Sequence, residues 1–138
     1  MSKDILLSKH FKLSEFTVSP TALRLHIDNS PGIEIVVALS TLVACCLQPL
    51  RTVVNTPIII NSGYRSELLN NAVGGTSRSQ HLIGEAADLS INEDITVLVS
   101  ALLKTGIPFD QCIVYVSRKF MHISYKRLST NRYNLIYK

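Results

Sequence analysis

The sequence predicts an α+β domain, a small antiparallel sheet with helices packed on one side. Residues 33–54 and 92–106 carry apolar side chains at helical spacing. Residues 109–117 and 120–125 form two strand-like runs joined by a tight turn. Consecutive strands favour antiparallel pairing, with the helices covering one face. The 138 residues, 46% of them hydrophobic, suffice for one domain, which we expect to span residues 1–138.

In the first half of the chain, residues that interrupt regular structure alternate with predicted helices and strands. A short helix is expected between the breaker at Pro20 and the one at Ser30. Pro49 lies within the helical pattern of 33–54 and should kink or end that helix. The β-branched run at 56–64 predicts a buried strand, because it is apolar and closes on Ser-Gly.

The second half supplies the remaining elements. Ser66 can cap a short helix, and Asn92 or Asp94 can cap the helix at 92–106. The pattern predicts further elements in this order: a short helix at 66–75, a strand at 86–91 and an edge strand at 133–138.

Charge and hydropathy narrow the choice of partners. The net charge is +4, and no basic run alternates with stacking aromatics, so we expect no nucleic-acid partner. A nucleic-acid binder that uses the basic C-terminal residues is the alternative. No apolar run approaches the roughly 18–20 uncharged residues of a membrane span. No secretory signal is recognisable, so we expect synthesis in the cytoplasm.

His81 and Asp88 lie on either side of a segment of small residues, and His122 lies in the last predicted strand. Side chains of a strand alternate between its two faces, so Asp88 and His122 can each line a cleft while their neighbours enter the core. A zinc site with an open position needs three protein ligands, commonly His with one carboxylate. The pattern therefore leaves two alternatives, a metal site or a His–Asp hydrogen bond that holds a loop.

Four segments carry a more specific signal. The segment "SQHLIGEAAD" has the form Ser-x-His-x-x-Gly-x-Ala-x-Asp, "SGYRS" precedes it, and "PFDQCIVY" with "FMHISY" follows it. Together they resemble the zinc D-alanyl-D-alanine carboxypeptidase family, which includes phage endolysins that cut L-alanyl-D-glutamate bonds. The resemblance runs from about residue 10 to about residue 126.

The resemblance implies a set of site residues. One Zn²⁺ per chain would be bound by His81, Asp88 and His122. Arg65 would hold a substrate carboxylate, since a guanidinium fork suits that geometry. Ser79 and Gln80 would shape the ligand loop and contact the substrate, with a hydrogen bond to the second nitrogen of His81.

The resemblance also implies a function. The chain would be a monomeric zinc metallopeptidase that cleaves peptidoglycan stem peptides by zinc-activated water, as a carboxypeptidase or as an endopeptidase of the endolysin type. It would reach the cell wall after a lysis-type release. The zinc would lie in a cleft on the sheet.

One position departs from the family pattern. Tyr115 stands where relatives carry the glutamate that acts as general base, and a phenol stays protonated at neutral pH. Asp110 could substitute from a bulged strand, although an odd separation from Tyr115 favours the opposite face. Glu85 is a candidate only if it lies in the loop before its strand. The alternative function is a cell-wall peptide-binding module that retains zinc but is catalytically weak or inactive.

Overall fold

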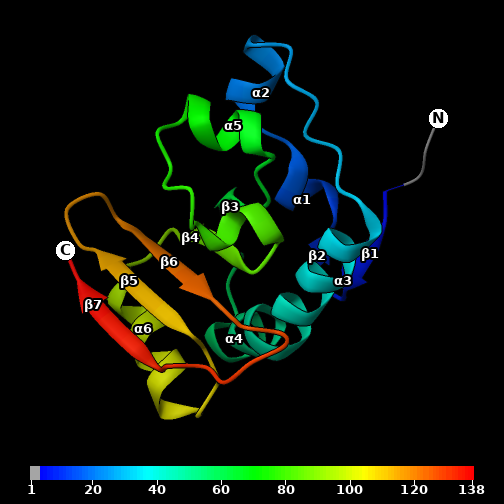
Figure 1. The fold of residues 1–138 in the computed structure, drawn as a ribbon. Helices are drawn as coiled ribbons and strands as arrows, with labels where there is room; N and C mark the ends of the chain where they lie inside the picture. The colour runs from blue at the N-terminus through cyan, green and yellow to red at the C-terminus, as the bar shows by residue number, and fades with distance from the viewer. Residues whose placement is uncertain (1–3) are drawn as a thin grey trace.

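The computed structural model describes residues 4–138 and confirms the α+β class (Figure 1). A five-stranded sheet has the order β3-β4-β6-β5-β7. All its pairs are antiparallel except β5 with β7, which is parallel. The strands are β3 (Ile59–Ser62), β4 (Ala86–Ser90), β5 (Gln111–Tyr115), β6 (Phe120–Ser124) and β7 (Asn134–Tyr137).

The helices lie close to their predicted positions. Ser66 caps its helix by accepting from the backbone N–H of Leu69, and Asp94, not Asn92, accepts from Thr96. The helices are α1 (Ser14–Thr17), α2 (Pro20–Arg24), α3 (Ile33–Leu42), a π-helix η1 (Val43–Leu47), α4 (Gln48–Val54), α5 (Glu67–Ala72), a 3₁₀ helix η2 (Gln80–Ile83) and α6 (Thr96–Lys104). A small hairpin, β1 (Leu6–Ser8) with β2 (Phe11–Lys12), precedes them.

The sheet has one core face and one cleft face. Helices α4 and α6 lie together on the core face, as Figure 1 shows. Alternate residues of three strands enter this core: Ala87, Leu89, Cys112, Val114, Met121 and Ile123. The intervening residues, among them Asp88 and His122, face the opposite side and are only partly buried. The predicted period-two pattern is therefore confirmed at the strands that carry the site.

Pro49 does not end the long helix. Proline lacks an N–H and its ring would meet the carbonyl four residues earlier, so a regular α-helix cannot continue through it unchanged. The structure inserts the π-helix η1 just before it, where the N–H of Gln48 donates to the carbonyl of Val43, five residues back. The helical segment consequently runs from Ile33 to Val54.

That segment has a length and hydropathy that a membrane span would also have. It contains 22 residues, and an 18-residue window within it has a mean hydropathy of 2.0. Because Glu34 and Arg51 lie in the segment, it is not the uncharged run that the sequence analysis excluded. Leu39, Leu42 and Leu50 have no exposed surface and belong to the core cluster beneath the sheet. These contacts place one face of the segment in the core of the domain.

Two details of the edge strands differ from prediction. β3 is an edge strand and Ile59 is 47% exposed, so the expected buried strand is wrong. Its β-branched residues fit a half-covered edge as well as a core, which is why composition alone misassigned it. β7 is an edge strand as predicted, but it runs parallel to β5, because the chain crosses back over residues 125–133 before pairing.

Asp110 supplies a stability prediction. It is fully buried just before β5 and accepts from the guanidinium of Arg132 at 2.9 and 3.1 Å. Burial by itself would raise the pKa of Asp110, but the hydrogen bonds and charge of Arg132 hold it below its usual value. The ion pair therefore stabilises the fold at neutral pH, and this stability is lost as the pH falls below about 4.

Asp110→Asn is accordingly expected to lower the free energy of unfolding at pH 7 by about 1–3 kcal/mol, because charge-assisted hydrogen bonds are lost. It should also flatten the acid dependence of stability below about pH 4. Urea denaturation at pH 7 and pH 3 measures both effects. An unchanged acid slope would show that other carboxylates govern acid unfolding.

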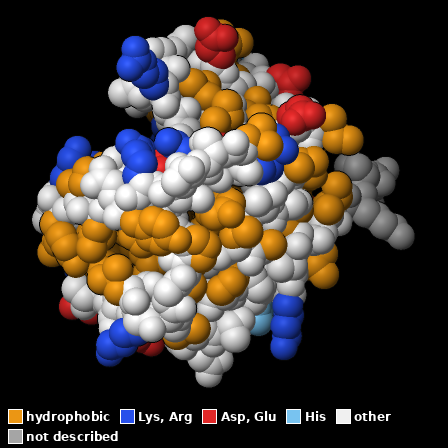
Figure 2. All heavy atoms as spheres, turned by 60° about the horizontal axis from the view of Figure 1, so that its bottom comes forward, with side chains coloured by type: hydrophobic (Ala, Val, Ile, Leu, Met, Phe, Trp, Pro, Cys, Tyr) orange, Lys and Arg blue, Asp and Glu red, His pale blue; other side chains and the backbone are white. Residues whose placement is uncertain are grey.

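Hydrophobic side chains form a band across the middle of the face shown in Figure 2. Several Lys and Arg side chains lie near one another above the left part of this band, and others stand singly elsewhere on the face.

Candidate metal centre

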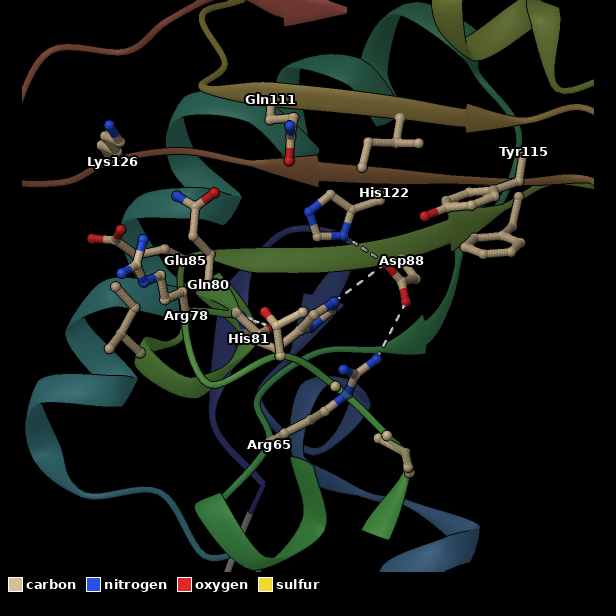
Figure 3. A pocket seen from close by; sticks show the side chains of 18 of the residues that line it. Arg65, Arg78, Gln80, His81, Glu85, Asp88, Gln111, Tyr115, His122 and Lys126 are labelled. Carbon is tan, nitrogen blue, oxygen red and sulfur yellow. Dashed lines mark hydrogen bonds and ion pairs between the residues drawn. The ribbon is translucent and has the colours of Figure 1, made fainter. Parts of the chain in front are cut away.

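Three predicted ligand residues meet on the cleft face of the sheet. Asp88 in β4 and His122 in β6 are directly paired across neighbouring strands. His81 reaches them from the 3₁₀ helix η2, which precedes β4. One ligand atom from each residue lies within 4.8 Å of the other two (Figure 3). The structure therefore brings all three residues together.

Local backbone structure places His81. The hydroxyl of Ser79 caps η2 by accepting from the N–H of His81, and Gly84 ends the helix in the left-handed region with φ 72°. Only a residue without a Cβ adopts that conformation readily, and a Cβ at Gly84 would lie 3.0 Å from the carbonyl of Ile35. This tight turn carries the chain from His81 to Asp88 in seven residues.

A backbone carbonyl fixes the orientation of the His81 ring. Nδ1 lies 2.6 Å from the carbonyl oxygen of Gly63, and the side chain is almost fully buried. Because a carbonyl only accepts, Nδ1 carries the proton and Nε2 faces the cleft. This is the outer hydrogen bond that orients histidine ligands in metal sites.

The three side chains converge on one oxygen. Oδ1 of Asp88 lies 3.3 Å from Nε2 of His81 and 2.9 Å from Nδ1 of His122. Burial by itself would raise the pKa of Asp88, but the hydrogen bonds of His122 and His81 hold it well below its usual range. Asp88 is consequently ionised, the form in which a carboxylate binds a metal.

The donor set fits a metal ion. With Nδ1 bonded to Gly63, Nε2 of His81 faces a carboxylate oxygen of Asp88, and this contact is favourable only if a proton or a cation lies between the two atoms. Zinc with bonds of about 2.0–2.2 Å keeps its ligand atoms roughly 3.3 Å apart. The observed separations are of that size. A simple His–Asp hydrogen bond would also leave the role of the second histidine unexplained.

Arg65 lies beside this cluster. One terminal nitrogen is 3.7 Å from Oδ2 of Asp88, and Nε–H donates to the hydroxyl of Ser62 at 3.2 Å. The other terminal nitrogen lies 3.4 Å from the amide oxygen of Asn70. The guanidinium is therefore held at the edge of the cleft by two neutral partners as well as by Asp88.

The cluster forms the floor of a cleft of about 920 Å³. Figure 3 shows Gln80 and Gln111 beside the cluster, with Arg78, Glu85 and Lys126 beyond them at one end and Tyr115 at the other. The volume is sufficient for several residues of a peptide.

Tyr115 occupies the hairpin end of this cleft. Its ring stacks on Phe120, with centroids 4.4 Å apart, and Figure 3 shows its hydroxyl directed toward His122 and Asp88. The position predicted for the general base therefore does face the candidate metal ligands.

The two substitute bases do not reach the cluster. Asp110 lies outside the cleft lining and is engaged by Arg132. Glu85 does lie in the loop before β4, but its carboxylate accepts from the backbone N–H of Arg127, and Figure 3 shows it at the far end of the cleft from Tyr115.

One contact differs from the sequence interpretation. Ser79 and Gln80 both line the cleft as expected, but the second nitrogen of His81 bonds to Gly63, not to either of them. Side-chain patterns could not reveal a backbone acceptor. The amide nitrogen of Gln80 is buried without a hydrogen-bond partner among residues 4–138.

Gly63 itself yields a prediction. A Cβ there would lie 2.6 Å from the carbonyl oxygen and 2.7 Å from the Cα of Phe16, so the backbone must shift. Gly63→Ala is therefore expected to displace the carbonyl that orients His81 and to weaken zinc binding roughly 10- to 100-fold, as loss of an outer partner does. Gly32→Ala is the matched control, since a Cβ at Gly32 meets nothing within 4 Å. Competition with a chromophoric chelator measures both variants, and equal affinities would contradict the role of Gly63.

Two histidines and a carboxylate at the floor of a peptide-sized cleft define a candidate metal-dependent hydrolase. The chain belongs to the peptidase M15 family, whose sequence model matches residues 9–124. It is also 54% identical over 33 residues to the zinc D-Ala-D-Ala carboxypeptidase of Streptomyces albus G. That match covers 24% of this chain and 13% of the relative, so it compares only a short segment of each. The resemblance noted in the sequence is thereby confirmed at the level of the family.

Proposed function

We propose that the protein is a zinc-dependent peptidase that hydrolyses peptidoglycan stem peptides. The observation that carries this proposal is the cluster of His81, Asp88 and His122 in the cleft, with the ring of His81 already oriented by a backbone carbonyl. Membership of the peptidase M15 family and the name of the carboxypeptidase relative support zinc as the metal and a wall peptide as the substrate.

The residues of the cleft would have two roles in hydrolysis, metal binding and substrate binding. His81, Asp88 and His122 would hold one zinc ion, which supplies Lewis acidity toward the scissile carbonyl and the attacking water. Arg65, steadied by Ser62 and Asn70, would bind a substrate carboxylate beside the cluster. This contact would orient the peptide bond over the cleft floor.

Hydrolysis also needs a group that accepts a proton from the attacking water. Within residues 4–138, Asp88 and Glu85 are the only carboxylates that line the cleft, and both are engaged by other groups. The Tyr115 hydroxyl can donate a hydrogen bond to developing charge, but it cannot take a proton from water at neutral pH. We therefore propose slow hydrolysis.

The lack of a free carboxylate in the cleft among residues 4–138 favours a second candidate function. A chain that keeps the metal ligands and Arg65 but has no carboxylate at residue 115 could bind zinc and a wall peptide without cutting it. This candidate predicts peptide binding with no detectable turnover, whereas the first predicts slow release of a product.

Two measurements test the proposal. Metal analysis of protein purified without chelator should find about one zinc per chain; a value well below one would contradict the metal centre. Zinc-loaded protein incubated with peptidoglycan fragments should release D-Ala or open peptide bonds, which mass spectrometry detects. Zinc binding without any product would favour the binding module.

A further inference from the structure

A second cavity adjoins the candidate metal centre on its hairpin side. It has a volume of about 440 Å³ and shares Asp88, Arg118 and Phe120 with the main cleft. Ser62 at the end of the edge strand β3 and Ser90 at the end of the neighbouring strand β4 also line it. The two cavities therefore meet at the carboxylate of Asp88, so an extended peptide can cross the cluster and enter both.

The charges of this second cavity are unbalanced. Arg118 and Lys119 supply two cations, and Asp88 is the only acid on its lining. Asp88 is already turned toward the two histidines and Arg65. Within residues 4–138, no carboxylate forms an ion pair with Arg118 or Lys119. The cavity thus presents positive charge with no counterpart in the described chain.

Aromatic contacts position the arginine. Its guanidinium carbon lies 5.0 Å from the ring centroid of Phe120 and 5.6 Å from that of Tyr115. These rings are stacked on each other, so they form a rigid support for the cation. No carboxylate among residues 4–138 pairs with this guanidinium, so its N–H donors can bind a planar carboxylate.

We propose that this second cavity is a subsite for a substrate carboxylate and that Arg118 determines this specificity. The substrate would be a peptide with one carboxylate near Arg65 and another on the hairpin side of the cluster. Each extended residue advances the chain by roughly 3.3–3.6 Å, so neighbouring residues of a short acidic peptide reach both cavities. This inference rests on the proposed peptidase function and specifies its substrate as an acidic peptide.

The test uses a soluble stem pentapeptide and the same peptide with its carboxylates amidated. Titrations of the zinc-free chain, followed by NMR, give both dissociation constants without hydrolysis. Arg118→Gln should weaken binding of the acidic peptide about three- to tenfold and change binding of the amidated peptide less than twofold. In the zinc-loaded protein the same variant should raise KM and leave kcat unchanged, because Arg118 touches no reacting atom.

Arg24→Gln is the matched control. It removes the same charge from an exposed position at the end of α2, outside the lining of both cavities, and should alter neither constant. The subsite would be overturned if Arg118→Gln weakened binding of the acidic and the amidated peptide equally. It would also be overturned if Arg118→Gln and Arg24→Gln had equal effects on binding. If the wild-type protein holds zinc and cleaves the peptide, but Arg118→Gln changes neither the dissociation constants nor KM, only this inference fails. If wild-type protein neither holds zinc nor binds either peptide, the proposed function fails with it.

Discussion

Replacing His122 with alanine is expected to lower the zinc affinity by more than about 100-fold. The change removes one of three candidate ligands, and its effect should exceed the roughly 10- to 100-fold cost of losing an outer partner. It also removes the contact at 2.9 Å that holds Oδ1 of Asp88 in the cluster. Competition with a chromophoric chelator gives the affinity. The stabilisation of the wild-type chain by zinc, about 2.7 kcal/mol at 100 times Kd, should disappear from the variant.

His26→Asn provides the control for this experiment. His26 is an exposed histidine at φ 55°, a conformation that asparagine tolerates well, and it lies outside the cleft. Its replacement should leave the zinc affinity unchanged. If His122→Ala retains wild-type affinity, then the cluster is a hydrogen-bonded structural pair and the metal-centre interpretation is wrong.

Tyr115→Glu is expected to raise kcat on wall peptides by about 10²- to 10⁴-fold, the usual contribution of a positioned general base. The Tyr115 hydroxyl already faces the candidate ligands, so a carboxylate at this position would point the same way. The pH profile should gain an acidic limb, because the new carboxylate must be ionised to accept a proton. Steady-state assays between pH 4 and pH 9 measure both changes.

Tyr115→Phe separates chemistry from packing. Phenylalanine keeps the stack on Phe120 but removes the hydroxyl, so it should not increase the rate. Glutamate loses that stack, at a cost of up to about 1.5 kcal/mol, which thermal denaturation will detect. If Tyr115→Glu is stable and binds zinc without any gain in rate, another group already accepts the proton.

The sequence predicted the cleft side of the sheet because strand alternation is a local property. Asp88 and His122 each alternate with core residues along their strands, and this fixes the face without knowledge of the pairing. The motif around His81 then identified the third member of the cluster. Helices with clear caps, such as the one that Ser66 begins, were predictable for the same reason.

Interactions between distant segments were not predictable in this way. The acceptor for His81 is a backbone carbonyl, and every residue carries one, so no side-chain pattern marks Gly63. The partner of Asp110 lies 22 residues away on a connection without periodicity. The parallel pairing of β7 likewise depends on the path of that connection, since an edge strand of the same composition could run in either direction.

The close approach of Gly63 to Phe16 links the metal centre to the beginning of the chain. Phe16 is buried in the core, and its carbonyl accepts from the N–H of Tyr64 at 2.7 Å. The loop that carries the His81 acceptor, which belongs to the family segment "SGYRS", therefore rests on α1. A fragment trimmed to begin after α1 would keep all three candidate ligands and yet lose the support for their geometry. In engineering terms, the smallest portable metal-binding unit must include α1 as well as the segments that carry the three candidate ligands.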